Sequence, residues 1–237
     1  MLRLLDMFCG AGGAAMGYHR AGFEVVGIDI KPQKHYPFKF YEADALEYCA
    51  KHGHEFDAIH ASPPCQGYSR LRHLPWLKNK KWPMLIDATR KLLTEIGKPW
   101  VIENVADAPL QGMTLCGQMF GLPLYRHRKF ETSFLMLCPP HSFHPEVIGH
   151  GRMVNDRRKG AGNGALGPQV IVTVAGGQYK KADGEKAMGI DWMTKDELSQ
   201  AVPPAYTEFI GRYLVANLVE TLIESGVYSA ALASRKE

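Results

Sequence analysis

Short apolar runs alternate with helical patterns along the first half of the chain. Runs rich in β-branched and aromatic residues predict strands at residues 2–8, 24–30, 56–61 and 99–105. Apolar side chains at helical spacing predict helices at residues 13–21, 45–51 and 84–96. Gly22 and Gly97 are placed to end two of these helices, and Pro83 to begin one. The alternation favours an α/β fold, a doubly wound, mostly parallel sheet with helices on both faces.

The pattern loosens beyond Phe134. Residues 138–167 are rich in Pro, His, Gly, Arg and Asn and predict a small loop-rich insert. A β-like run returns at 170–174, and residues 205–225 predict a long amphipathic helix. Thr194 and Glu197 have the spacing of a helix-capping box.

These patterns divide the chain into three parts. We expect a catalytic and cofactor-binding core over residues 1–130, an insert over 131–185, and a C-terminal segment over 186–237 that returns to the core. The last residues, 230–237, are expected to fray.

Composition is that of one sizeable intracellular domain. The 237 residues are 46% hydrophobic, enough for one large core. The net charge of +4 permits a polyanionic partner without requiring one. Five scattered cysteines are not a disulfide framework and favour a reducing compartment. The chain begins without a secretory signal and has no apolar run of about 18 residues, so we expect a cytoplasmic protein without membrane segments.

A glycine-rich turn, FCGAGG at residues 8–13, lies between the first predicted strand and helix. Such glycines let a ligand approach the backbone, and Asp29 at the end of the next strand can accept hydrogen bonds from ribose hydroxyls. The pattern predicts a nucleoside-cofactor site. Tight strand-to-helix packing is the alternative. A nicotinamide-dependent oxidoreductase also stays open, although Ala15 replaces the third glycine of the dinucleotide fingerprint.

Cys65 comes just after the third predicted strand, in the segment ASPPCQGYS at residues 61–69. Open α/β sheets build their active sites at the carboxyl ends of parallel strands, so the Cys65 thiolate is a candidate nucleophile. A small buried apolar residue is the alternative. We expect the basic residues that follow to lower the pKa of the thiol. They are Arg70, Arg72, Lys78, Lys80 and Lys81.

Ordered motifs give the chain a resemblance to the cytosine-5 DNA methyltransferase family. The matching segments are LDMFCGAGG at residues 5–13, PCQ at 64–66, ENV at 103–105, RHR at 126–128 and AVPP at 201–204. They resemble, in order, the first cofactor motif, the nucleophile motif, the Glu-Asn-Val motif, the Arg-x-Arg motif and the end of the last motif. Two positions depart from the family pattern. Leu124 replaces a Gln, and Ser199-Gln200 replaces Gly-Asn.

The resemblance implies methyl transfer from S-adenosylmethionine to C5 of a cytosine flipped out of double-stranded DNA. Cys65 would add to C6 of the base, Glu103 would supply a proton at N3, and Arg128 would hold O2. Arg126 would support the neighbouring backbone. The residues expected at the cofactor are Phe8, Gly10, Gly12, Gly13, Asp29, Ile30, Asp44, Ala45, Pro64, Gln200 and Val202. For Asp44, a helix N-cap is the alternative role.

Two basic stretches are expected to contact DNA. The segment 69–81 suits a loop that closes over the duplex, and the insert suits recognition of a short sequence by contacts to base edges. The candidate contacts are Gln66, Ser69, Arg70, Arg72, Lys80, Arg152, Arg157 and Arg158. Solvated surface positions are the alternative for all of them. We expect the enzyme to act as a monomer.

Three other interpretations stay open. One is a related enzyme that acts on RNA, and another is a catalytically silent DNA-binding relative, which the altered Leu124 and last motif permit. The third concerns metal ligands, since Cys138, His141 and His144 are closely spaced, with Cys116 upstream. Because the paired doublets of a structural zinc site are missing, we predict no metal and interpret this segment as a DNA-facing loop.

Overall fold

The computed structural model describes residues 1–75, 77, 79–141, 148–149, 171–175 and 179–224. Seven strands form one sheet in the order β3-β2-β1-β4-β5-β7-β6. Their bounds are β1 Arg3–Met7, β2 Glu24–Asp29, β3 Lys39–Glu42, β4 Ala58–Ala61, β5 Trp100–Val105, β6 Met113–Leu115 and β7 Arg128–Thr132. The first five strands are parallel, and β7 runs antiparallel to both of its neighbours. The expected doubly wound, mostly parallel α/β fold is confirmed.

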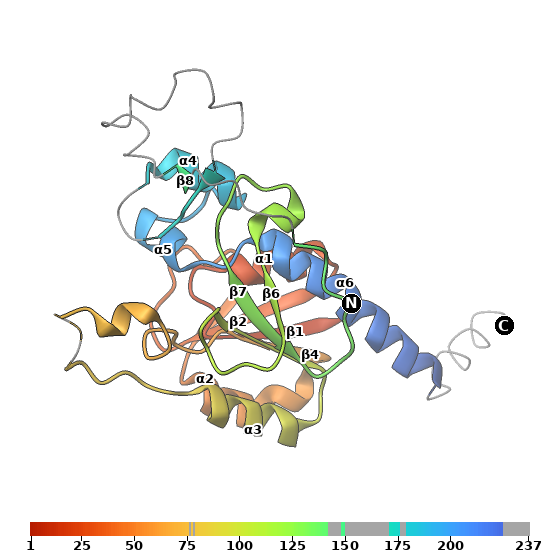
Figure 1. Ribbon diagram of the computed structural model, residues 1–237. Coiled ribbons are helices and arrows are strands. Elements are labelled where there is room, and N and C mark those ends of the chain that lie inside the picture. The colour runs from red at the N-terminus through yellow and green to blue at the C-terminus, as the bar shows by residue number, and fades with distance from the viewer. Residues whose placement is uncertain (76, 78, 142–147, 150–170, 176–178, 225–237) are drawn as a thin grey trace, which may run out of the picture.

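Helices cover both faces of the sheet (Figure 1). The helices that cover the sheet are α1 Gly13–Arg20, α2 Ala45–His52, α3 Ile86–Ile96 and α6 Pro204–Glu224. Leu4 and Val25 point into a buried cluster with α1 and α6, whereas Leu5 and Val26 point into a second one with α2 and α3. This alternation of neighbouring residues is the period of two that a strand buried on both faces requires.

The C-terminal helix α6 packs directly against α1. A Cβ at Gly17 would collide with the Pro204 carbonyl oxygen and the Thr207 hydroxyl, so only glycine permits this approach. The buried Thr207 hydroxyl donates a hydrogen bond to the Ala14 carbonyl over 2.8 Å. The end of the described chain is thereby fixed to the helix that follows the glycine-rich turn.

A third buried cluster forms beside the sheet from α4 Lys181–Met188, α5 Lys195–Gln200 and β9 Ile171–Val172. Strand β9 pairs with β8 Ile148–Gly149. The Thr194 side chain and Glu197 form the expected capping box at the start of α5. Three short 3₁₀ helices complete the elements, η1 Gly53–Glu55, η2 Arg70–His73 and η3 Gly117–Phe120.

Several elements depart from the sequence-based expectations. Strands β3, β6 and β7 and helix α4 were not predicted. Strand β3, KFYE, lies at the sheet edge. Its sequence lacks an apolar run because a lysine, an exposed tyrosine and a glutamate make up three of its four residues. Strand β6 has only three residues. Strand β7, RKFET, lacks an apolar run because three of its five side chains, those of Arg128, Lys129 and Glu131, are charged.

Element boundaries also shift. Helix α3 begins at Ile86 after an N-cap at Leu85, so Pro83 lies outside it. Strand β4 is shorter than the apolar run at 56–61. The expected boundary between core and insert, 130/131, falls inside β7, and residues 230–237 lie outside the described residues. Within the described part of the chain, no helix combines the length and apolar character that crossing a membrane requires.

Candidate active site

Three predicted catalytic residues come from neighbouring strands. Cys65 follows the carboxyl end of β4, and Glu103 lies near the carboxyl end of β5. Because β7 is antiparallel to β5, with Val105 opposite Arg128, its first residue reaches the same edge of the sheet. Arg128 Nε lies 3.0 Å from Glu103 Oε1, with both side chains largely buried.

The loop that carries Cys65 is held from both sides. The buried Asn104 side-chain amide donates to the Pro63 carbonyl oxygen over 2.8 Å. The backbone N–H groups of Tyr68 and Ser69 both donate to the Cys65 carbonyl oxygen. Asn104 therefore links β5 to the Cys65 loop. It was part of the quoted ENV motif, but sequence reasoning gave it no role.

Burial raises the pKa of the Cys65 thiol above its usual value. Arg128 and Arg126 oppose this effect by favouring the thiolate, whereas Glu103 adds to it. The expectation that the basic segment after Cys65 lowers this pKa is wrong. The cations that act most strongly on the thiol are Arg128, the first residue of β7, and Arg126, two residues before it, rather than Arg70, Arg72, Lys80 or Lys81. Lys78 lies outside the described residues.

Glu103 is buried, and desolvation raises the pKa of its carboxyl group. Arg128, a hydrogen bond from Ser62 and Arg126 act in the opposite direction and lower it. Because burial is the largest of these effects, the carboxyl group holds its proton to higher pH than an exposed glutamate. A protonated carboxyl can donate a hydrogen bond to a base nitrogen.

A buried chain of hydrogen bonds leads to Glu103. The Tyr18 hydroxyl lies 2.9 Å from His60 Nδ1, and His60 Nε2 lies 2.9 Å from Ser62 Oγ. Burial lowers the pKa of His60 to about 3, so the ring is neutral and has one donor. If Ser62 donates to Glu103, its oxygen accepts from His60 Nε2–H, and Nδ1 accepts from Tyr18. Sequence reasoning missed this chain, for which a polar histidine in a buried strand was the only signal.

Arg126 is buried and connects the site to the third cluster. Its guanidinium donates to the carbonyl oxygens of Val174 and Ser199, the latter over 2.8 Å, and the Tyr206 hydroxyl donates to the Arg126 carbonyl over 2.6 Å. Burial and the neighbouring Arg128 lower its pKa to about 9. Leu124, which stands at the altered family position, is fully buried and packs in the same cluster.

The glycine-rich turn has the geometry of a ligand cradle. Gly12 adopts a φ of +84° that favours glycine, and a Cβ at Gly13 would collide with the Val202 carbonyl oxygen. A Cβ at Gly10 would meet no atom within 4 Å, so open space lies above the turn. Asp29 fixes the turn by accepting the Gly10 N–H at 3.1 Å and the Lys31 N–H at 3.0 Å.

The other predicted cofactor residues divide into two groups. Phe8, with a φ of +57°, the half-buried Pro64 and Ile30, which is 67% exposed, lie at the ends of β1, β4 and β2. The second group consists of four residues that either make contacts within the protein or lie on its surface. Asp44 caps α2 through the Leu46 and Glu47 N–H groups, Ala45 is buried in the core, Gln200 is exposed, and Val202 is buried against the glycine turn.

Asp6 is a buried carboxylic acid that sequence reasoning did not single out. It lies in β1 between the apolar Leu5 and Met7, and no hydrogen bond of ordinary length reaches its carboxylate oxygens from the described residues. Desolvation, with a smaller effect of Asp29, raises its pKa well above the usual value. An acidic residue inside an apolar strand was the available signal.

The predicted DNA contacts are only partly described. Gln66, Arg70, Arg72 and Lys80 are exposed, and Ser69 is half-buried. Arg70 pairs with Asp107 at 2.8 Å, and the Lys80 ammonium lies 4.5 Å from the Trp82 ring centroid. Their segment, which includes η2, projects from the body of the molecule (Figure 1). Arg152, Arg157 and Arg158 lie outside the described residues.

Comparison with known proteins finds similarity to one family in the N-terminal part of the chain. Residues 2–109 match the C-5 cytosine-specific DNA methylase family. The chain is 28% identical over 111 residues to the type II methyltransferase M.FnuDI of Fusobacterium nucleatum, a match that covers 44% of this chain and 32% of the relative. The similarity to the C-5 cytosine-specific DNA methylase family therefore covers the N-terminal part of the chain. The match spans about a third of the relative's length.

Solved structures share the fold over nearly the whole chain. A candidate DNA modification methyltransferase from an E. coli prophage matches with a TM-score of 0.56 and 15% identity, covering 93% of this chain and 100% of the other. S. pombe Dnmt2 methyltransferase gives 0.54 and 15%, covering 93% and 99%. The Entamoeba histolytica methyltransferase EhMeth gives 0.55 and 14%, covering 92% and 99%. At this identity, the likeness concerns the fold.

Proposed function

We propose that this protein is a DNA cytosine-5 methyltransferase that uses S-adenosylmethionine and attacks its base with Cys65. The observation that carries the proposal is the convergence of Cys65, Glu103 and Arg128 at one edge of the sheet, where Arg128 Nε lies 3.0 Å from Glu103 Oε1. A nucleophile, a buried acid and a cation are the groups that addition to a cytosine ring requires.

The reaction begins with addition of the Cys65 thiolate to C6 of the flipped base. The electron pair of the C5–C6 double bond moves into the ring toward N3, where Glu103 supplies a proton, while Arg128 holds O2. Carbon C5 thereby gains enamine character and becomes nucleophilic. After methyl transfer, the C5 proton leaves to a base, the bond between Cys65 and C6 breaks with its electron pair returning to sulfur, and the N3 proton returns to Glu103, which restores the aromatic ring. Each protein group acts on one position of the base.

The charges around Cys65 and Glu103 bear on these roles. Cys65 must lose its proton to attack, and although burial raises its pKa, Arg128 and Arg126 oppose that rise and favour the thiolate. Glu103 must keep its proton, and burial favours that state. The ion pair with Arg128 limits the rise in the Glu103 pKa. The same arginine thus favours the charged form of both Cys65, which must be deprotonated, and Glu103, which must be protonated.

The residues at the glycine-rich turn fit S-adenosylmethionine. Open space above Gly10 allows a ligand to approach the backbone, and Asp29, at the end of β2, has lone pairs left for ribose hydroxyls. The exposed Ile30 and half-buried Phe8 offer apolar contacts for an adenine ring. When bound, the cofactor supplies an activated methyl group on a sulfonium centre. Asp44 has one carboxylate oxygen engaged in the α2 cap, so it is a weaker candidate for an adenine contact.

The proposed substrate is double-stranded DNA, from which the target base is flipped because C5 and C6 are inaccessible inside a duplex. The projecting segment 69–81 contributes cationic side chains for phosphates. The insert, with Arg152, Arg157 and Arg158, is proposed to read the sequence. We propose that one copy of the chain suffices, because a single copy contains all three reacting groups.

The test compares the parent protein with Cys65→Ser. Duplex DNA and structured RNA are each incubated with labelled S-adenosylmethionine, and DNA containing 5-fluorocytosine is used to trap a covalent complex. We expect methylated duplex DNA and a trapped complex for the parent, neither for Cys65→Ser, and both for the control Cys49→Ala. Labelling of RNA alone would reassign the substrate. Absence of labelling and trapping despite DNA binding would identify a silent relative, and labelling by Cys65→Ser at the parent rate would refute the mechanism.

A further inference from the structure

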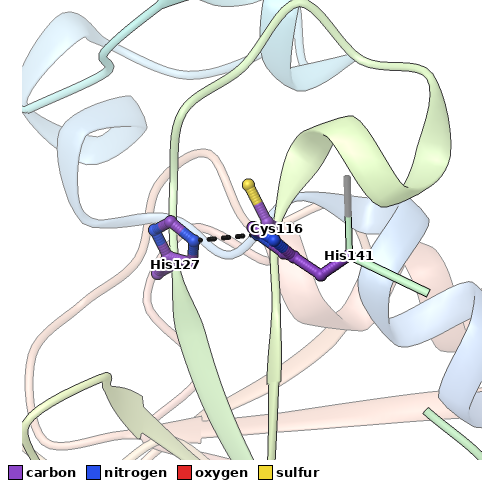
Figure 2. A group of neighbouring side chains, drawn as sticks. All are labelled: Cys116, His127 and His141. Atoms are coloured by element: carbon purple, nitrogen blue, oxygen red, sulfur yellow. Dashed lines mark hydrogen bonds between the residues drawn. The ribbon is translucent and has the colours of Figure 1, made fainter. Parts of the chain in front are cut away.

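The geometry points to a divalent metal site, of the zinc class, formed by Cys116, His127 and His141. One potential ligand atom of each residue lies within 4.8 Å of those of the other two. Figure 2 shows the two imidazole rings facing one another with the cysteine side chain beside them. Sulfur and imidazole nitrogen are the ligands that zinc prefers. This site is separate from the residues proposed to perform methyl transfer.

The distance between the two histidines fits a shared ion. His127 Nε2 and His141 Nε2 lie 3.2 Å apart. Two nitrogens bound to one tetrahedral zinc ion at about 2.0–2.1 Å are about 3.3–3.4 Å apart. Without an ion, the same contact is a hydrogen bond in which one ring must donate and the other accept. A metal ion accommodates both neutral rings with their Nε2 lone pairs directed to the same point.

The burial of the ligands gives the site an inner and an outer side. Cys116 is fully buried, His127 is half-buried, and His141 is exposed. The Cys116 thiol donates a weak hydrogen bond to the Leu124 carbonyl oxygen at 4.0 Å. On metal binding the S–H bond is replaced by an S–metal bond and the proton leaves to solvent. Binding is therefore expected to strengthen as the pH rises. A water molecule would complete four-coordination on the His141 side.

The positions of the ligands indicate what the ion does. Cys116 directly follows β6, His127 directly precedes β7, and His141 lies in the chain that leaves β7 toward the insert. An ion bound by all three would fasten the beginning of the insert to the β6–β7 pair. His127 lies between Arg126 and Arg128 in the sequence, so the ion would also restrain the segment that carries both arginines. We therefore assign it a structural role.

The test measures metal directly and does not depend on methyl transfer. The full chain is purified, dialysed against metal-free buffer, and analysed for zinc by mass spectrometry. Zinc is then replaced by Co²⁺, whose absorption shows a sulfur-to-cobalt charge-transfer band when a thiolate is bound. We expect about one metal ion per chain and this band, because the proposed site has three protein ligands that include one thiolate.

Variants identify the ligands. Cys116→Ser is expected to remove the charge-transfer band. His127→Gln and His141→Gln are expected to weaken metal binding more strongly than the loss of a hydrogen-bond partner of a ligand does, which typically costs about 10- to 100-fold. The matched control is Cys138→Ser, because Cys138 is an exposed cysteine close to His141. Its metal content and spectrum should match the parent. Circular dichroism verifies that each variant is folded. If Cys116→Ser unfolds, His141→Gln still tests the site, because His141 is exposed and its substitution does not disturb the core.

Three results would overturn the assignment. They are a parent chain that neither retains zinc nor gives cobalt bands on titration, a bound metal without a thiolate band, and loss of the band in Cys138→Ser but not in Cys116→Ser. A protein that binds zinc but transfers no methyl group would support this site while contradicting the proposed function. A protein that transfers methyl groups but binds no zinc would support the proposed function while contradicting this site. The two proposals can therefore fail separately.

Discussion

Two clusters meet where the chain enters β7, and they differ in how they are built. Arg128 joins Cys65 and Glu103, whereas the preceding residue, His127, joins Cys116 and His141. The first cluster is assembled from the ends of adjacent strands of the parallel sheet and the antiparallel strand beside it. The second is assembled from the ends of β6 and β7 and a later loop. The order of motifs in the sequence can reveal a site that is built at strand ends. A site whose residues come from separate loops can be recognised only once the fold is known.

The largest expected difference between the clusters lies in catalysis. Glu103→Gln should lower methyl transfer by roughly 10²- to 10⁴-fold, because an amide cannot supply the proton at N3. His141→Gln should release metal with a loss of less than about tenfold, since it touches none of the groups proposed to react. Single-turnover rates on duplex DNA measure both variants. The surface variant Glu95→Gln is the control, and equal losses at Glu103 and His141 would abolish the distinction.

Arg126 tests whether the first cluster depends on the fold around it. Arg126→Ala should lower the free energy of unfolding by about 3 kcal/mol, because it leaves the Val174 and Ser199 carbonyl oxygens without their donor and removes a buried side chain. Arg212→Ala, which breaks an exposed pair with Glu208, should cost less than about 1 kcal/mol. Urea denaturation measures both. A loss at Arg126 no larger than at Arg212 would contradict the structural role.

Arg128 tests which cations act on the Cys65 thiol. Arg128→Gln should raise the thiol pKa further, because the arginine favours the thiolate. At a fixed pH below that pKa, a smaller fraction is ionised, and alkylation of Cys65 by iodoacetamide should slow by about three- to tenfold. Peptide mass spectrometry measures the rate. Arg72→Gln should leave it unchanged, and slowing by Arg72→Gln instead would restore the sequence-based expectation.

Ser62 should give the smallest effect. Its hydrogen bond lowers the pKa of Glu103, so Ser62→Ala should raise this pKa further. If the reaction requires protonated Glu103, activity declines as pH rises through that pKa. The alkaline limb of the pH profile for kcat/KM should therefore move to higher pH in Ser62→Ala. If the acidic limb moved to higher pH instead and the alkaline limb stayed in place, Glu103 would act as a carboxylate and the proposed role would be contradicted.

The sequence predicted four of the five parallel strands, because β1, β2, β4 and β5 are largely buried and separated by glycine and proline signals. The residues at strand ends, Cys65 and Glu103, were accessible for the same reason. The parallel edge strand β3 was missed because it lacks an apolar run. Strand β7 was missed as well, since Arg128 and Lys129 interrupt its apolar pattern. Arg128 was found by motif order alone, and its pairing with Glu103 required the antiparallel register.

Other features depend on contacts between distant residues and therefore escaped prediction. The chain from Tyr18 through His60 to Ser62 joins α1 to β4 in the interior, where the sequence gives only isolated polar residues. His127 is hidden as a ligand between two arginines. The pKa shift of the Cys65 thiol was predicted in the wrong direction because burial of the thiol, which the sequence does not show, outweighs the positive charges near it.

The close packing of α6 on α1 has a consequence for synthesis of the protein. The cradle at residues 8–13 is translated long before Val202 and Thr207, which pack on the turn and fasten the helix that follows it. Nascent chains that stop before them carry every group proposed to react with the base and still have an uncovered turn. If the turn holds the methyl donor as proposed, such premature termination products should retain it less tightly than the longer chain.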